Sequence, residues 1–121
     1  MNTKNYWLVG ANWDGNDQAE IFYRRGCWEM GYGDDEKPTL TKRRNEIHAG
    51  DRIALKSMDG KGATTITIKA IGVVTDMADK KVFIDWKLTN LNRTVQSHGA
   101  FATIHGPYSF SDSWTKEVFC L

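Results

Sequence analysis

Hydrophobic and polar side chains alternate with a period of two over much of the second half of the chain. The alternating or β-branched runs cover residues 52–57, 64–75, 81–88 and, more briefly, 101–104. Such runs predict strands. Turn-forming residues at 59–62 and 79–80 separate the first three runs, which favours an antiparallel meander. Gly72 interrupts the longest run and predicts a bulge or a close backbone approach there.

The rest of the chain predicts one further strand and two or three short helices. The expected elements are a strand at 5–11, a helix at 17–25, a loop at 29–38, a helix at 41–47 and a final helix after residue 112. The boundary residues are Asn16 or Asp17 at the start of the first helix, Gly26 at its end, Thr41 at the start of the second and Asp112 at the start of the third.

A single domain over residues 1–121 accounts for this pattern, since no repeat, linker or low-complexity tract divides the chain. Consecutive strands with short helices around them predict the α+β class. The first strand must either join the edge of the sheet or close it. We therefore expect a small bent β-barrel of about five to six mostly antiparallel strands, flanked by two or three short helices.

The charge balance gives the domain no general attraction to nucleic acid or membranes. Lys and Arg total 16 and Asp and Glu total 15, which leaves a formal net charge of +1. Any affinity for nucleic acid must therefore come from a local patch and depend on salt. The one dense cluster is Lys42-Arg43-Arg44, which is either a solvated helix face or a set of phosphate contacts beside a pocket.

The sequence favours a reduced, cytoplasmic setting. No signal peptide precedes the first apolar run, and no stretch is apolar enough for a membrane span. Cys27 and Cys120 lie far apart and lack metal-ligand spacing, so we expect two free thiols, with a disulfide between them as the alternative. We expect no membrane partner, and the oligomeric state stays open.

Familiar signatures of catalysis are missing from the sequence. His48, His98 and His105 lack a hydrolase context, and neither a G-x-S-x-G nor a phosphate-loop motif is present. Cys27 has no neighbour in sequence that would lower the pKa of its thiol. His98 and His105 could approach each other across a strand, but a third metal ligand is not evident. We predict no enzymatic activity, no metal and no cofactor.

The five Trp residues exceed what a core of this size needs. Trp13 lies in a polar Asn/Asp/Gly loop, and Trp28 follows the end of the first predicted helix. Two such rings could hold a planar ligand between them, with Asn12 and Asp14 bonding to its edge. The alternative is that both rings pack against the loops. We assign Trp7 and Trp86 to the core. Trp114 either covers the barrel or forms part of the pocket wall.

Five short motifs follow one another along residues 5–88, about two thirds of the chain. They are NYWLVGANW at 5–13, Gly-Cys-Trp at 26–28, GDRIALKS at 50–57, AIGVV at 70–74 and VFIDWKL at 82–88. In this order they resemble the PUA-like superfamily, which contains the EVE and YTH domains. The Gly-Cys-Trp step is similar to the Gly-x-Trp of YTH domains, and the later motifs to strands of EVE domains. The chain is most similar in character to the EVE-like domains of methyl-dependent restriction systems.

This resemblance implies a PUA-like barrel that holds a methylated base in an aromatic cage. Trp28 would form one wall, and Asn12 and Asp14 would contact the edge of the base. Residues 76–81 offer no aromatic side chain where YTH domains carry their second cage Trp. The second wall would therefore come from one of four aromatic residues, Trp13, Tyr108, Phe110 or Trp114.

The sequence thus favours a non-catalytic module that captures a modified nucleobase in DNA or RNA. The expected base-binding residues are Asn12, Trp13, Asp14, Trp28, Ser57, Tyr108 and Trp114. The expected phosphate contacts are Arg24, Arg25, Lys42, Arg43 and Arg44. One alternative is an ASCH-type hydrolase of modified nucleosides that uses Lys56 and Glu29, and another is a protein-interaction domain.

Overall fold

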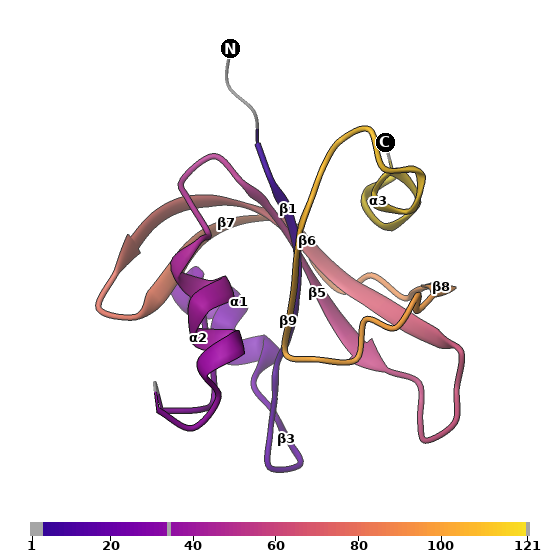
Figure 1. Cartoon of the computed structure of the whole chain (residues 1–121), viewed down its shortest axis with the longest axis horizontal. Coiled ribbons are helices and arrows are strands. Elements are labelled where there is room, and N and C mark those ends of the chain that lie inside the picture. Colours follow the sequence, from indigo (N-terminus) through magenta and orange to yellow (C-terminus); the bar gives the residue numbers. More distant parts are fainter. Residues whose placement is uncertain (1–3, 34, 121) are drawn as a thin grey trace.

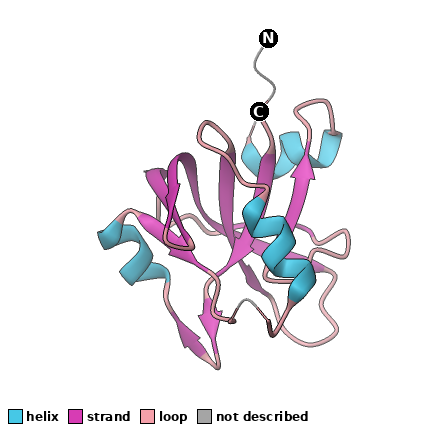
Figure 2. Ribbon diagram, turned by 60° about the vertical axis from the view of Figure 1, so that its left-hand side comes forward, coloured by secondary structure: helices cyan, strands magenta, loops and turns pink. Residues whose placement is uncertain are grey.

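The computed structural model describes residues 4–33 and 35–120, which form a curled mixed sheet with three helices (Figures 1 and 2). The strands are β1 (Tyr6–Gly10), β2 (Asn12–Trp13), β3 (Asn16–Asp17), β4 (Cys27–Glu29), β5 (Arg52–Met58), β6 (Thr65–Ala78), β7 (Lys81–Leu88), β8 (Arg93–Gln96) and β9 (Ile104–Tyr108). The helices are α1 (Ala19–Arg25), α2 (Pro38–Asn45) and α3 (Ser113–Phe119). The α+β class is therefore confirmed. Among the described residues, no helix combines the length and apolarity that crossing a membrane requires.

The main sheet runs in the order β4-β7-β6-β5-β1-β9, and β8 pairs with β6 beside this path. The predicted meander is confirmed as β5-β6-β7. β1 adds to the free side of β5 in parallel, and β9 then pairs antiparallel with the other side of β1. The sheet is mostly antiparallel, as expected, but its seven strands exceed the predicted five to six. The two-residue strands β2 and β3 form a separate hairpin.

Local signals placed α3 and the end of α1 correctly, but the expected start of α1 at Asn16 or Asp17 was wrong, because these two residues form β3 and α1 begins at Ala19. Gly26 ends α1 in the left-handed conformation, with φ at 62°, which glycine adopts without a Cβ penalty. The side chain of Asp112 accepts a hydrogen bond from the backbone N–H of Thr115 and caps α3. The prediction for α2 was wrong at its start, because Pro38 rather than Thr41 opens the helix. Proline suits the first turn, where its missing N–H costs nothing.

Three strand assignments needed correction. The strand expected at 101–104 begins only at Ile104, as β9. β8 (Arg93–Gln96) was missed because its RTVQ sequence is mostly polar. β4 lies in three residues after α1 that sequence alone did not mark as a strand. Both missed strands are short and pair with residues distant in sequence, so no local signal defines them.

Two hydrophobic cores lie on the two faces of the sheet. One core contains Trp7 and Val9 of β1 and packs against α1 and α2, and the other contains Tyr6 and Leu8 and packs against α3. Figure 1 shows α1 and α2 on one side of the sheet and α3 on the other. β1 is therefore buried on both faces, which explains its continuous apolar sequence. The prediction of Trp7 as a core residue is confirmed.

A bulge at Lys69 moves β6 from one core to the other. Leu55 pairs with Ala70 and Lys56 pairs with Ile68, so Lys69 is an extra residue on β6. Ile66 and Ile68 pack in the α3 core, whereas Ala70 packs in the α1/α2 core, although all three positions share one parity. An inserted residue reverses the alternation in this way.

Gly72 lies at a second irregularity, where the pairing of β6 with β7 shifts after Ile71. A Cβ at Gly72 would lie 2.9 Å from the carbonyl oxygen of Asp85 and 2.5 Å from a methyl carbon of Ile84. Both parts of the prediction for Gly72, the bulge and the close approach, are therefore confirmed.

The buried carboxylate of Asp51 ties the start of β1 to the start of β5. Its Oδ1 accepts the backbone N–H of Asn5 at 3.1 Å, and its Oδ2 accepts the indole N–H of Trp7 at 3.0 Å. The backbone N–H of His48 also donates to Oδ2, at 2.9 Å. Only 4% of the Asp51 surface is exposed and its bond to Trp7 is buried, so the indole N–H would have no other acceptor without it.

We expect Asp51→Ala to reduce the free energy of unfolding by about 2–4 kcal/mol, because the buried indole N–H of Trp7 and two partly buried backbone N–H groups lose their acceptor. Urea denaturation followed by circular dichroism measures this. Asp85→Ala is the matched control, since Asp85 is exposed and pairs only with the exposed Lys87. Its effect should stay within about 0.5 kcal/mol. Equal stability of the two variants would show that Asp51 does not hold the strands together.

Candidate functional site

The main pocket lies where the parallel strands β1 and β5 end. Because parallel strands have their carboxyl ends at the same edge, Gly10 and Lys56 come together there, paired in register. The cavity has a volume of about 290 Å³. It is lined by Gly10, Ala11, Asn12, Asp17, Leu55, Lys56, Ser57, Met58, Lys69, Phe101, Ala102 and Thr103. The wall opposite the strands is thus the loop that leads into β9.

Lys56 is buried at this pocket without a partner. Only 4% of its surface is exposed, and it makes no hydrogen bond or ion pair within the described part of the chain. A Cβ placed on Gly10 would lie 3.9 Å from Lys56 Nζ, so the glycine leaves space beside the ammonium group. Burial lowers the pKa of Lys56 to about 8. The side chain therefore still carries its proton at neutral pH.

His105 and Arg43 lie close enough to Lys56 to share its electrostatic environment. The backbone N–H of Ala102 donates to His105 Nε2 at 2.8 Å, which requires that nitrogen to be unprotonated. Arg43 donates from one guanidinium nitrogen to the carbonyl oxygen of Ile104 at 2.7 Å. Burial, followed by the charges of Lys56 and Arg43, lowers the pKa of His105 to about 4. At neutral pH His105 is therefore a neutral imidazole beside two cations, Lys56 and Arg43, and of these two cations Lys56 lines the pocket whereas Arg43 does not.

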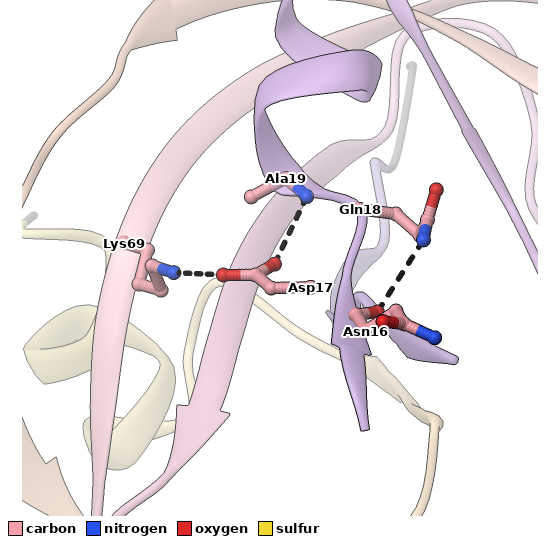
Figure 3. A network of polar contacts seen from close by, with 5 residues as sticks. All are labelled: Asn16, Asp17, Gln18, Ala19 and Lys69. Carbon is pink, nitrogen blue, oxygen red and sulfur yellow. Dashed lines mark hydrogen bonds and ion pairs between the residues drawn. The ribbon is translucent and has the colours of Figure 1, made fainter. Parts of the chain in front are cut away.

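An ion pair separates the pocket from an adjoining hollow. Lys69 Nζ lies 2.8 Å from Asp17 Oδ2, and the backbone N–H of Ala19 donates to Asp17 Oδ1 at 2.9 Å (Figure 3). Partial burial raises the pKa of Asp17, but the hydrogen bonds from Lys69 and Ala19 outweigh it and leave the pKa below its usual value. Asp17, Ser57 and Lys69 line both cavities. The bulge in β6 therefore supplies the cation that pairs with Asp17, the only carboxylate lining the pocket among the described residues.

Two of the predicted base-binding residues line the pocket, Asn12 and Ser57. Asn12 Oδ1 accepts the backbone N–H of Gly15 at 2.7 Å, which fixes the side chain and leaves its amide N–H groups without a partner among the described residues. The Ser57 hydroxyl also makes no hydrogen bond in that part of the chain. Both side chains can therefore bond to a ligand.

The prediction that Trp28 forms a pocket wall is wrong. Its exposed fraction is 0%, and it packs in the α1/α2 core. Its indole N–H donates to the carbonyl oxygen of Gly10 at 2.8 Å. Trp28 therefore supports the pocket from behind by fixing the end of β1, and no ligand can stack on its ring.

Trp13 and Asp14 are also outside the pocket lining. The ring of Trp13 packs edge-on against Phe22, with 5.8 Å between ring centroids, and covers Gly31, where a Cβ would lie 2.6 Å from the indole. Asp14 lies exposed in the turn of the β2–β3 hairpin with φ at 49°. The alternative interpretation, in which Trp13 packs against its loop, agrees with the structure. Trp86 is only partly buried, but it packs against the same core as predicted.

The C-terminal aromatic residues gather on the other face of the sheet. Trp114 packs in the α3 core, and Tyr108 meets it edge-on, with 5.2 Å between their centroids. His98 stacks on the other part of the indole at the same separation. Phe110 lies exposed near Tyr6. None of these residues lines the pocket, so Tyr108, Phe110 and Trp114 do not supply a second wall.

The predicted phosphate contacts divide by exposure. Arg24, Arg25 and Lys42 are exposed, Arg43 is half-buried, and Arg44 has only 4% of its surface exposed. The guanidinium of Arg44 contacts Asn45 Oδ1 at 3.2 Å. Residues 42–44 therefore do not form a uniformly solvated face, and the expectation that Arg44 binds phosphate stays a prediction. None of the five cations lines the pocket.

Sequence analysis did not predict several of the residues that line the pocket, and no common local sequence pattern marks them. Phe101 is the only aromatic side chain in the lining and is 48% exposed. Lys56 was considered only as a catalytic residue beside Glu29. Glu29 pairs with Lys81 in the sheet and does not line the pocket, so that pairing is wrong. A lysine in an otherwise apolar strand was the one available signal for a buried charge.

The chemistry of the other reactive groups is limited. Burial, and secondly the charge of Glu29, raises the pKa of the Cys27 thiol, which disfavours the reactive thiolate. Cys27 and Cys120 are both free thiols in the structure, as expected. Residues 4–33 and 35–120 contain no group of three or more His, Cys, Asp or Glu side chains that could hold a metal ion.

Comparison with known proteins adds no family to this description. No protein-family model matches the chain, and no curated protein sequence is significantly similar to it.

The low pKa of His105 predicts a loss of stability in acid. The unfolded imidazole takes up a proton near its usual value of 6.5, whereas the folded one resists protonation until about pH 4. Acid therefore favours the unfolded chain as the pH falls from 6.5 to about 4, and the contribution is fully present above pH 6.5. Urea midpoints measured across this window should fall more steeply for the wild type than for His105→Gln, which cannot titrate. Identical slopes would contradict the assignment.

Proposed function

We propose that this domain binds a nucleobase of DNA or RNA in the pocket between β1, β5 and the loop before β9, and that it does not transform the base. The observation that supports this most directly is the combination of three side chains in the lining of one pocket. The amide of Asn12 and the hydroxyl of Ser57 have no partner among the described residues and can bond to the edge of a base, and the ring of Phe101 is exposed beside them. The proposal keeps the PUA-like assignment and the cytoplasmic setting that the sequence favours.

The size of the cavity suits a single base. Its volume of about 290 Å³ lies at the lower end of the range for small-ligand pockets, roughly 300–1,000 Å³. A flat ring can stack on Phe101 at the mouth, a contact worth about 1–3 kcal/mol. One aromatic wall replaces the cage that the resemblance implied, because Trp13 and Trp28 are packed elsewhere.

Polar and positively charged side chains near the pocket can contact the nucleotides that flank the bound base. Lys69 lies at the boundary between the pocket and the adjoining hollow, where Asn90 and Asn92 add polar groups. Tyr23 lines the same hollow, and burial together with Asp17 and Glu20 raises its pKa to about 12, so its phenol stays a hydrogen-bond donor. Arg24, Arg25 and Lys42 remain the proposed contacts for more distant phosphates.

Stacking on Phe101 gives the first test. We expect Phe101→Ala to weaken binding of short single-stranded oligonucleotides by about tenfold, from the loss of one stacking contact. Fluorescence anisotropy at fixed salt measures the affinity. Phe110→Ala is the control, because Phe110 is exposed to a similar degree, 56% against 48%, but lies away from the pocket.

Equal affinities for the Phe101→Ala and Phe110→Ala variants would contradict binding in this pocket. A screen of DNA and RNA strands in which the wild type binds nothing would contradict the function itself. A stable protein partner in that case would favour the protein-interaction alternative.

One observation favours a second candidate, a hydrolase of acylated nucleosides. Lys56 does line the pocket, and a lysine with a pKa of about 8 can exchange protons near neutral pH. Water would add to the acyl carbonyl, the amide C–N bond would break, and the carboxylic acid and the nucleoside with its free amino group would leave. The carboxylate near Lys56 would then be Asp17 rather than Glu29.

Turnover separates the two candidates. The binding proposal predicts that wild-type protein releases no acetate from N4-acetylcytidine over the rate in buffer, as followed by chromatography. Release by the wild type that disappears in Lys56→Met would assign the domain to the hydrolases instead.

A further inference from the structure

The unpaired ammonium group of Lys56 is the most unusual feature of the pocket. Removing a charge from water is costly unless a partner of opposite charge or several acceptors replace the lost hydration. Lys56 has neither within the described residues, and only 4% of its surface is exposed. A fold keeps such a group at a cost in stability, so the missing partner points to a ligand.

The surroundings of Lys56 exclude an internal counter-ion. Its neighbour His105 is neutral at ordinary pH, and Arg43, which also acts on His105, is a cation that bonds to the carbonyl of Ile104. Among the residues that the structure describes, Asp17 is the only carboxylate in the lining, and it already holds Lys69 and the N–H of Ala19. Figure 3 shows both contacts converging on the one carboxylate. The potential in the pocket is therefore positive.

The unpartnered polar side chains of the lining donate hydrogen bonds. Asn12 offers its amide N–H groups, because its oxygen is occupied by Gly15. Lys56 offers an ammonium group, and Ser57 a hydroxyl that can donate. A ligand matching this set carries oxygen acceptors, of which the one nearest Lys56 bears negative charge.

We propose that the pocket selects a planar pyrimidine that carries a carboxylate, with an anionic oxygen bound to Lys56. The planar part of this ligand rests on the proposed function, whereas the negative charge rests on Lys56 and its neighbours alone. The same chemistry is available in a carboxylated base within a strand and in a free pyrimidine carboxylate. The experiment therefore includes both.

The test compares ligands that share a ring and differ in charge. Short DNA strands with one central 5-carboxycytosine, 5-methylcytosine or cytosine are titrated by anisotropy, and free uracil-5-carboxylate and thymine by calorimetry. We expect the wild type to prefer the carboxylated member by about tenfold or more, the value of one charge-assisted hydrogen bond. Lys56→Met should abolish this preference.

Two further variants separate charge from shape. Lys61→Met removes one positive charge from the exposed turn before β6 and should keep the full preference. Gly10→Ala keeps every charge. Its new methyl group would lie in ordinary van der Waals contact with Lys56 Nζ, so the chain should fold. The methyl group would take space beside the ammonium group, so affinity for the carboxylated ligand should fall about tenfold. Lys56→Met should itself melt at the same temperature as the wild type or higher, because it removes a buried unpaired charge.

The outcomes distinguish this inference from the proposed function. Strands bound equally well with 5-methylcytosine and 5-carboxycytosine would overturn the inference and leave base binding intact. Binding of free uracil-5-carboxylate alone, lost in Lys56→Met, would support the inference and contradict capture of a base within a strand. Failure of both carboxylates to bind the wild type would overturn the inference. If Lys56→Met failed to fold, the preference of the wild type and its loss in Gly10→Ala would decide.

Discussion

The parallel pairing of β1 with β5 is the constraint on which the rest of the structure depends. Its register places Gly10 beside Lys56, and the glycine leaves room for the lysine to reach the cavity. Asp51 fixes the two strands at their start, and Trp28 fixes the carbonyl of Gly10 at their end. β1 is buried on both faces, so neither strand can slip without exposing a core.

Stability and binding oppose each other in this arrangement. The sheet buries Lys56 without a counter-ion, while the bulge at Lys69 provides a cation that occupies Asp17. Pairing Lys56 with Asp17 instead would have relieved the buried charge and closed the pocket to anions. The observed pairing leaves the ammonium group available to the anionic ligand that we propose, in a site where low polarity would strengthen each electrostatic contact. Strain of this kind is typical of functional sites.

Sequence patterns predicted the meander and the helices, because period-two alternation, turn residues and caps such as Gly26 and Asp112 are local signals. They did not predict the pocket, since it arises where β1 meets a strand more than forty residues away in sequence. Trp28 shows the reason most clearly: a Trp just after the end of a predicted helix suggested display, but it belongs to the three-residue strand β4 and lies in the core. Asn12 follows directly on the strand predicted at 5–11, Ser57 ends the strand predicted at 52–57, and both line the cavity.

The most direct test of the central claim is the position of a bound base, mapped by changes in the backbone amide NMR signals during titration with a short oligonucleotide. The account predicts that the largest changes cluster at Gly10, Asn12, Ser57 and Thr103, around one cavity. Changes centred on Tyr108 and Trp114, on the other face of the sheet, would contradict it.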